Sequence, residues 1–161
     1  MRVNQFEQRQ RLPRPPEEAF EFFGDAQNLE VLTPPWLRFA IVSVEPPELR
    51  AGALIEYRLR VRGIPVRWTS RITAWEPGRR FVDEQIRGPY KYWEHTHWFE
   101  PDGQGGTWMT DRVRYSMPFG PVGRLAHRLF VHRDLRRIFD YRRERISALL
   151  SAQTTRSPAS E

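Results

Sequence analysis

Residues 81–116, FVDEQIRGPYKYWEHTHWFEPDGQGGTWMTDRVRYS, consist of three runs rich in aromatic and β-branched residues. The first two runs are separated by Gly88 and Pro89, and the last two by the glycine-rich segment DGQGG. Short runs of this composition, bounded by turn residues, are typical of strands joined as antiparallel hairpins. The stretch therefore predicts three neighbouring antiparallel strands, at residues 81–87, 92–100 and 107–116.

Side chains of a strand alternate between its two faces, and in these three strands one face mixes aromatic with polar residues. Taken as the inward face, it carries the polar residues Asp83, Gln85, His95, His97 and Asp111. Pairing through the first turn puts Asp83 opposite His95. Pairing through the glycine-rich turn puts Asp111 near His95 or His97. The pattern predicts a polar cluster inside an aromatic wall.

This inward polar cluster leaves three interpretations open. An unpaired polar group in a core costs about 1–3 kcal/mol, so the groups must bond to one another, to water or to a ligand. They form a network that fixes the strand register, a set of groups that orients a ligand, or an acid–base apparatus with Tyr115 or Tyr57 as proton donor. The catalytic candidates are His95, His97, Asp83, Asp111 and Tyr115. A His95→Ala variant that still folds but binds ligand differently favours the second interpretation over the first.

The chain before residue 81 predicts four further strands and two short helices. Pro16 suits the first position of a helix, and Asp25 can cap the next one. Alternation puts Tyr57, Leu59 and Trp68 on inward faces, and Gly63-Ile64-Pro65 is expected to form the turn between their strands. We expect strands at residues 2–11, 39–45, 54–62 and 66–75, and helices at residues 16–23 and 25–32.

After the last strand, apolar residues recur at helical spacing, among them Leu125, Leu129, Leu135 and Phe139, with arginines on the other faces. The pattern continues to Leu150 and predicts a helix of roughly 25–28 residues, which at 1.5 Å per residue crosses a whole sheet. The polar tail at residues 151–161 is expected to be disordered. One domain, residues 1–150, would thus be an α+β fold in which a seven-stranded curved antiparallel sheet wraps a long C-terminal helix, with two short helices after the first strand. Because a sheet that bends around one helix leaves a space between them, we expect a cavity there.

The composition excludes several classes of protein. The 161 residues include no cysteine, which excludes disulfides and thiolate chemistry. The net charge is +6, but acidic residues are interspersed with the basic ones, which disfavours nucleic-acid binding. The N-terminus lacks the apolar region of a signal peptide, and no apolar run approaches the ~20 residues that cross a bilayer. We expect a cytoplasmic protein.

Two motifs could indicate a cofactor. His95 and His97 face one side of a strand and could chelate a metal with Asp83 or Asp111, but this spacing is common by chance. The glycines of the DGQGG segment lack the lysine and the following helix of a phosphate loop. The sequence alone therefore gives no reason to expect a metal or another cofactor.

Three segments together resemble the SRPBCC superfamily: Thr33-Pro34-Pro35-Trp36-Leu37, the Gly-Ile-Pro run at residues 63–65, and GPYKYWEHTHWF at residues 88–99. Within it the chain is similar to an uncharacterised bacterial branch of ligand-binding proteins. The superfamily includes START lipid-transfer domains, plant pathogenesis-related allergens and polyketide cyclases/dehydratases. The resemblance, over about residues 1–150, implies a helix-grip fold with a cavity for lipids, polyketides, quinones or similar molecules. It carries over no catalytic motif.

We therefore expect a carrier of a small hydrophobic ligand rather than an enzyme. An apolar wall gives such a cavity affinity, and a few polar groups orient the ligand. A polyketide cyclase or dehydratase using the same cavity is one alternative, and a protein-interaction module using the basic C-terminal helix is another. The helix could also contact an anionic membrane transiently during ligand uptake. The expected ligand-binding residues are Tyr57, Leu59, Trp68, Asp83, Gln85, Trp93, His95, His97, Phe99, Met109, Asp111, Tyr115, Leu125, Leu129 and Phe139.

Overall fold

The computed structural model describes residues 1–154, and its strands form one antiparallel sheet in the order β1-β7-β6-β5-β4-β3-β2. The N-terminal strand lies beside the last one, and the other neighbours are consecutive in sequence. This confirms the predicted α+β helix-grip architecture with seven strands. The strands are β1 (Asn4–Leu12), β2 (Ala40–Glu45), β3 (Leu54–Val61), β4 (Ile64–Glu76), β5 (Arg80–Arg87), β6 (Tyr92–Pro101) and β7 (Thr107–Ser116).

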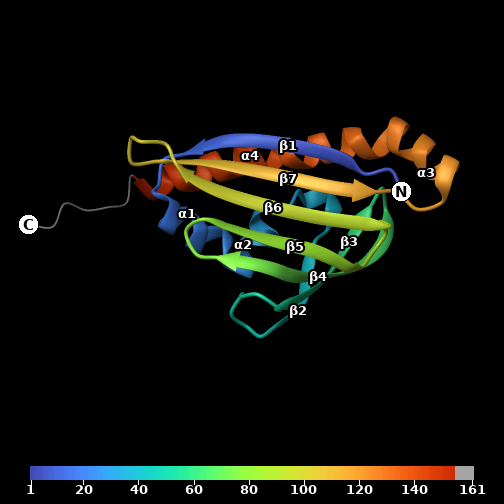
Figure 1. Cartoon of the computed structure of the whole chain (residues 1–161), viewed down its shortest axis with the longest axis horizontal. Coiled ribbons are helices and arrows are strands. Elements are labelled where there is room, and N and C mark those ends of the chain that lie inside the picture. The colour runs from blue at the N-terminus through green and yellow to red at the C-terminus, as the bar shows by residue number, and fades with distance from the viewer. Residues whose placement is uncertain (155–161) are drawn as a thin grey trace, which may run out of the picture.

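Helices lie on one face of the curved sheet, with α4 running along it behind β1 and β7 (Figure 1). Pro16 begins the first helix as predicted. The Asp25 side chain caps the second by accepting a hydrogen bond of 3.0 Å from the backbone N–H of Gln27. The helical segments are α1 (Pro16–Phe23), α2 (Ala26–Leu32), η1 (Pro35–Leu37), α3 (Gly120–Ala126), η2 (His127–Val131) and α4 (His132–Thr154).

The C-terminal helix is longer than predicted and less regular. It begins at Gly120, and η2 is a short π-helical segment whose flanking residues, Ala126 and His132, keep right-handed helical angles. Leu135 and Phe139 are buried, but Leu125 of α3 and Leu129 of η2 are exposed. The helix α3 extends past the strand ends, where no strand lies against it (Figure 1). The prediction of a single inward stripe starting at Leu125 is therefore wrong.

The turn between β3 and β4 also differs from the prediction. Val61 pairs with Ile64, so the turn consists of Arg62 and Gly63 alone, with φ angles of 50° and 80°. Positive φ at both residues is typical of a type I′ turn, whose twist matches that of the strands it joins. Ile64 and Pro65 lie in β4 and not in the turn.

The register of the central strands follows the prediction. Asp83 pairs with His95 across β5 and β6, and His97 pairs with Asp111 across β6 and β7. The inward polar residues are thus brought together by three adjacent strands.

The main core lies at one end of the sheet, where Phe20 of α1 and Ile146 of α4 pack with Phe99 and Met109. A second cluster joins Phe6, Val113 and Tyr115 to Leu135 and Phe139 of α4. These clusters hold α4 against the sheet.

The end of the chain was predicted to be a disordered tail at residues 151–161. The helix α4 continues to Thr154, so residues 151–154 are helical, and residues 155–161 lie outside the described residues. Within the part of the chain that the structure describes, no helix is both long and apolar enough to span a membrane.

Candidate ligand cavity

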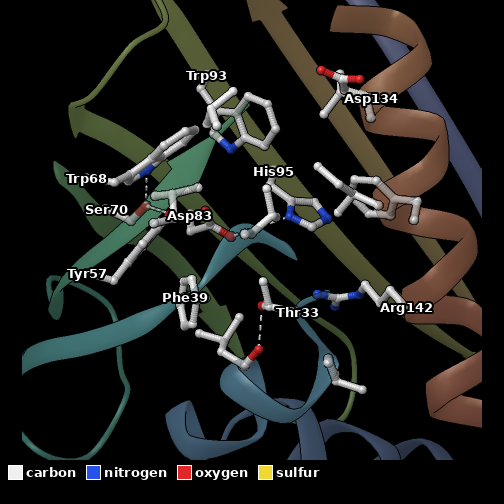
Figure 2. Close-up of a pocket in the computed structure, with 18 of the residues that line it drawn as sticks. Thr33, Phe39, Tyr57, Trp68, Ser70, Asp83, Trp93, His95, Asp134 and Arg142 are labelled. Atoms are coloured by element: carbon white, nitrogen blue, oxygen red, sulfur yellow. Dashed lines mark hydrogen bonds and ion pairs between the residues drawn. The ribbon is translucent and has the colours of Figure 1, made fainter. Parts of the chain in front are cut away.

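A cavity of about 620 Å³ lies between the sheet and the C-terminal helix. Residues of β3 to β6 form one side of it, residues of α4 form the other, and the segment from α2 to Phe39 closes it. Figure 2 shows Tyr57 and Trp93 on the strands and Arg142 on α4 reaching into the same space. Pockets of roughly 300–1,000 Å³ are typical of sites for drug-sized ligands.

The sheet side of the cavity is a connected set of aromatic rings. Tyr57 and Trp68 stack with centroids 5.8 Å apart and an interplanar angle of 16°. Trp93 meets Trp68 edge to face at 5.1 Å, Tyr90 lies 4.8 Å from Trp93, and Phe39 lies 4.8 Å from Tyr57. Rings packed against one another in this way hold their orientations, so the wall offers a preformed surface for a flat apolar molecule.

The polar atoms of this wall are largely paired with each other. Trp68 Nε1 donates a hydrogen bond of 3.0 Å to Ser70 Oγ, and the Tyr57 hydroxyl lies 3.5 Å from the same oxygen. Burial, followed by the negative charge of Asp83, raises the pKa of Tyr57 well above its ordinary value. The Tyr57 phenol therefore stays protonated and keeps a donor at the cavity wall.

The polar cluster predicted from the sequence forms a compact network beside this wall. The rings of His95 and His97 lie 3.7 Å apart, between Asp83 on β5 and Asp111 on β7. His95 Nε2 lies 2.8 Å from Asp111 Oδ1, and His97 Nε2 lies 3.2 Å from Asp83 Oδ2. His97 Nδ1 is 3.1 Å from Asp111 Oδ1, but its direction is too far from that of a hydrogen bond to count as one.

The charges of the network follow from its burial. Burial alone would raise the pKa of Asp111, but the Arg142 guanidinium, the hydrogen bond of His95 and the close contact of His97 hold this pKa well below its usual value. Burial, followed by the charge of His97, lowers the pKa of His95. An ionised Asp111 is only an acceptor, so His95 donates from Nε2 and its Nδ1 is left free of a proton when the ring is neutral.

Arg142 enters the cavity from α4 and is only 9% exposed. Its Nε has no hydrogen-bond partner among the described residues, and its ion-pair contact with Asp111 is long, at 3.7 Å. The guanidinium also lies 5.4 Å from the ring centre of Phe23 and 5.9 Å from that of Phe139. A buried guanidinium with donors to spare is a strong binding group for a carboxylate or another anionic oxygen.

The structure places about half of the expected ligand-binding residues at the cavity. The eight that line it are Tyr57, Leu59, Trp68, Asp83, Trp93, His95, His97 and Phe139. The seven that do not line it are Gln85, Phe99, Met109, Asp111, Tyr115, Leu125 and Leu129.

The misplaced residues have identifiable partners. Phe99 and Met109 face inward but belong to the core around α1, where the sheet and helices meet without a gap. The Tyr115 hydroxyl lies 2.7 Å from His127 Nε2, and the Gln85 side chain bonds to the backbone of Tyr90. Asp111 does not line the cavity, but it contacts three residues that do: His95, His97 and Arg142.

Leu125 and Leu129 of the C-terminal helix also lie away from the cavity. Their side chains, on α3 and η2, are 57% and 52% exposed.

Sequence reasoning missed part of the cavity wall. Arg142 is the most informative residue missed, and its spacing was a usable signal: it follows Leu135 by seven residues and Phe139 by three, which puts it on the buried face of the helix. Tyr90 lies in a connecting segment, where no alternation indicates which way a side chain points, and Phe39, expected to begin a strand, precedes β2, which begins at Ala40.

The fold is shared with many solved structures, at identities that establish the fold alone. The Zhui aromatase/cyclase from Streptomyces sp. R1128 aligns with a TM-score of 0.77 and 13% identity over 99% of this chain and 100% of that one. A norcoclaurine synthase from Thalictrum flavum, a point mutant solved with a transition-state analogue, aligns with a TM-score of 0.70 and 12% identity, covering 94% and 96%. A START superfamily protein from Mycobacterium smegmatis aligns with a TM-score of 0.65 and 12% identity, covering 90% and 98%.

No functionally curated protein matches the chain by sequence. One family model does, that of polyketide cyclase / dehydrase and lipid transport proteins, and it covers residues 4–150. The match spans every strand and nearly all of the C-terminal helix. The chain is therefore a member of the polyketide cyclase / dehydrase and lipid transport family, within the SRPBCC superfamily.

Proposed function

We propose that this protein binds and carries a small, largely apolar, aromatic ligand with one acidic group. The observation that carries the proposal is the cavity itself, an aromatic chamber with one buried guanidinium, that of Arg142, whose Nε lacks a hydrogen-bond partner within residues 1–154. A buried charged group whose donors are incompletely paired is costly, and a ligand carboxylate or enolate would supply the missing acceptor.

The shape of the chamber supports an aromatic ligand. The stacked pair Tyr57 and Trp68 and the edge of Trp93 offer flat faces, while Arg142 lies on the opposite side, on α4 (Figure 2). A molecule with its rings against the strands and its acidic end toward the helix satisfies both sides.

The direct test is native mass spectrometry of the protein purified under mild conditions, followed by solvent extraction. We expect an adduct of a few hundred daltons that is lost on denaturation and that extracts as an acidic aromatic compound. A protein that arrives without an adduct from several expression hosts, and that binds no acidic aromatic probe, contradicts the proposal.

A cyclase or dehydratase activity is the second candidate function. Its supporting observation is that Asp83, His95 and His97 line the cavity beside the protonated phenol of Tyr57. The first three residues could supply a general base, and the phenol a proton donor, to the same space. Tyr115, the other donor considered, bonds to His127 away from the cavity. Recovery of the bound molecule chemically unchanged after long incubation favours the carrier, and conversion favours the enzyme.

Ligand uptake from an anionic membrane is the finer part of the proposal. Phe119, Val122, Leu125, Leu129 and Phe130, here called the helical patch, are 46–82% exposed along α3 and η2, with Arg124 and Arg128 beside them. Exposed apolar side chains next to arginines are typical of helices that lie at an anionic membrane surface.

One end of the helical patch, at Phe130, reaches a residue that lines the cavity. Phe130 stacks on the guanidinium of Arg62, which lines the cavity, at 4.6 Å from its ring centre. A membrane-bound patch would therefore bring the cavity opening to the lipid surface. A pure protein-interaction module has no need of such a chamber, which counts against the third function considered.

Vesicle co-sedimentation tests this contact. The wild type is expected to bind vesicles of anionic lipid and not those of neutral lipid, and a Leu125→Ser/Leu129→Ser variant should lose most of the binding. The matched control, Val42→Ser/Ile86→Ser, removes two apolar residues of similar exposure from the sheet and should bind as the wild type does. Equal binding by both variants contradicts the membrane contact.

A further inference from the structure

Three potential metal ligands converge at the cavity surface. Asp83 Oδ2 lies 3.2 Å from His97 Nε2 and 3.9 Å from His95 Nδ1, and one donor atom from each residue lies within 4.8 Å of the other two. Ligand atoms held tetrahedrally at 2.0–2.1 Å from a zinc ion lie about 3.3 Å from one another. The separation between Asp83 and His97 thus matches that of two zinc ligands, and His95 offers a third donor atom within 4.8 Å of both.

The second ring nitrogens of His95 and His97, those not facing Asp83, both lie close to the carboxylate of Asp111. His95 Nε2 is 2.8 Å and His97 Nδ1 is 3.1 Å from Asp111 Oδ1. Metal-bound histidines in proteins typically hold their second nitrogen against a carboxylate, which fixes the ring orientation and the tautomer. Here one buried aspartate occupies that position for two neighbouring rings.

This arrangement leaves electron pairs facing one another. With protons on the nitrogens that face Asp111, His95 Nδ1, His97 Nε2 and Asp83 Oδ2 all present lone pairs to the same small space. A cation between them removes the repulsion. The competing arrangement places the proton of His97 on Nε2, which then donates the 3.2 Å hydrogen bond to Asp83, and leaves Nδ1 without a hydrogen-bond partner among the described residues.

We propose that Asp83, His95 and His97 form a binding site for one divalent transition-metal ion. Two imidazoles and a carboxylate, without thiolate, suit Zn²⁺ and neighbouring first-row ions. All three residues line the cavity, so the remaining coordination positions face the space where a ligand would bind. Asp111 is a positioning residue for the two histidines. The inference stands apart from the carrier proposal, because it concerns only the chain's own residues and an ion.

The test is equilibrium dialysis of untagged protein against Zn²⁺, with metal content measured by mass spectrometry. We expect one Zn²⁺ per chain for the wild type and none for Asp83→Asn or His97→Gln. The matched control, His127→Gln/His132→Gln, removes the two other histidines of the chain and should keep one Zn²⁺. Asp111→Asn should weaken binding by about 10- to 100-fold.

Replacement of Zn²⁺ by Co²⁺ adds a spectroscopic measurement. A Co²⁺ ion bound through two imidazoles should show visible absorption bands that are absent in His97→Gln and unchanged in the His127→Gln/His132→Gln control. Circular dichroism checks that each variant is folded. If His97→Gln does not fold, the metal content of Asp83→Asn tests the proposal instead. The proposal is overturned if the wild type takes up no Zn²⁺, or if only the His127→Gln/His132→Gln control loses it. Asp83, His95 and His97 would then form only a hydrogen-bonded network with Asp111.

Discussion

The imidazole of His95 on β6 hydrogen-bonds to Asp111 on β7, which lies diagonally across from it. The residue directly opposite His95 in the register is Val113. Diagonal neighbours on paired strands lie within reach of long side chains. His97, the register partner of Asp111, meets the same carboxylate oxygen. One buried aspartate thus orients two adjacent imidazoles and turns their other nitrogens toward β5 and the cavity.

Arg142→Gln should change which ligands bind. Because a hydrogen bond to a charged group contributes about 1.5–3 kcal/mol, loss of the guanidinium should weaken binding of an acidic aromatic dye by roughly 10- to 100-fold. Fluorescence titration with anilinonaphthalene sulfonate, which is anionic, and with Nile red, which is neutral, measures this. The exposed Arg145→Gln on the same helix is the control. An equal loss of both dyes in Arg142→Gln would show that the residue shapes the cavity and does not recognise charge.

Leu59→Trp should fill part of the cavity. Leu59 lines the chamber from β3, so a larger ring there occupies space that a ligand would use. We expect both dyes to bind at least tenfold more weakly, with little change in the midpoint of thermal unfolding. Ile86→Trp, on an exposed position of β5, is the control and should bind both dyes normally. Unchanged binding by Leu59→Trp would place the ligand outside this cavity.

The bidentate ion pair between Arg62 and Asp134 joins the β3–β4 turn to α4 at the cavity, with N–O distances of 2.9 and 2.8 Å. Asp134→Asn should speed dye release by up to about fivefold, because a partly exposed pair contributes about 0.2–1 kcal/mol. Stopped-flow displacement measures the rate. Asp140→Asn, which removes an exposed carboxylate from the same helix, should release the dye at the wild-type rate. Identical rates in both variants would mean that ligands leave by another route.

Tyr115→Phe should affect stability and not binding. The variant loses the hydrogen bond between the hydroxyl and His127, at a cost of about 1 kcal/mol, while dye affinity stays unchanged. Burial raises the pKa of Tyr115 to about 12. The folded state therefore holds this proton more tightly than the unfolded chain does, and the resulting stability is present below pH 10 and lost as the pH rises toward 12.

Urea unfolding of the wild type and of Tyr115→Phe between pH 9 and pH 11 measures this effect, because the variant lacks one of the titrating phenols. Its stability should fall less steeply with pH than that of the wild type. Parallel curves would mean that the hydroxyl of Tyr115 does not contribute to the alkaline transition.

Met109→Ala separates the core from the cavity wall. Met109 is 1% exposed and packs in the cluster around α1, so the cavity left by truncation should lower the free energy of unfolding by about 2–5 kcal/mol. Because Met109 does not line the ligand chamber, the affinity for both dyes should be unchanged at a temperature where the variant is folded. A large loss of dye binding would contradict this separation.

The sequence was sufficient for the architecture and for the pairing of the polar residues. Turn residues at regular intervals defined the hairpins, and a strand period of two was enough to put Asp83, His95, His97 and Asp111 on one face. The register confirms both predicted pairings. These features are local, because they depend on alternation and on the lengths of short turns.

Only the tertiary structure decided which inward residues meet the cavity. Phe99 and Trp93 face the same side of β6, yet one packs against Phe20 of α1 and the other lines the chamber. The difference depends on where α1 and α4 touch the sheet and where the curved sheet separates from them, which alternation within a strand cannot express. For the same reason, the helical period could place Arg142 on a buried face, while its position opposite Asp83 and the histidines required the packing of α4 on the sheet.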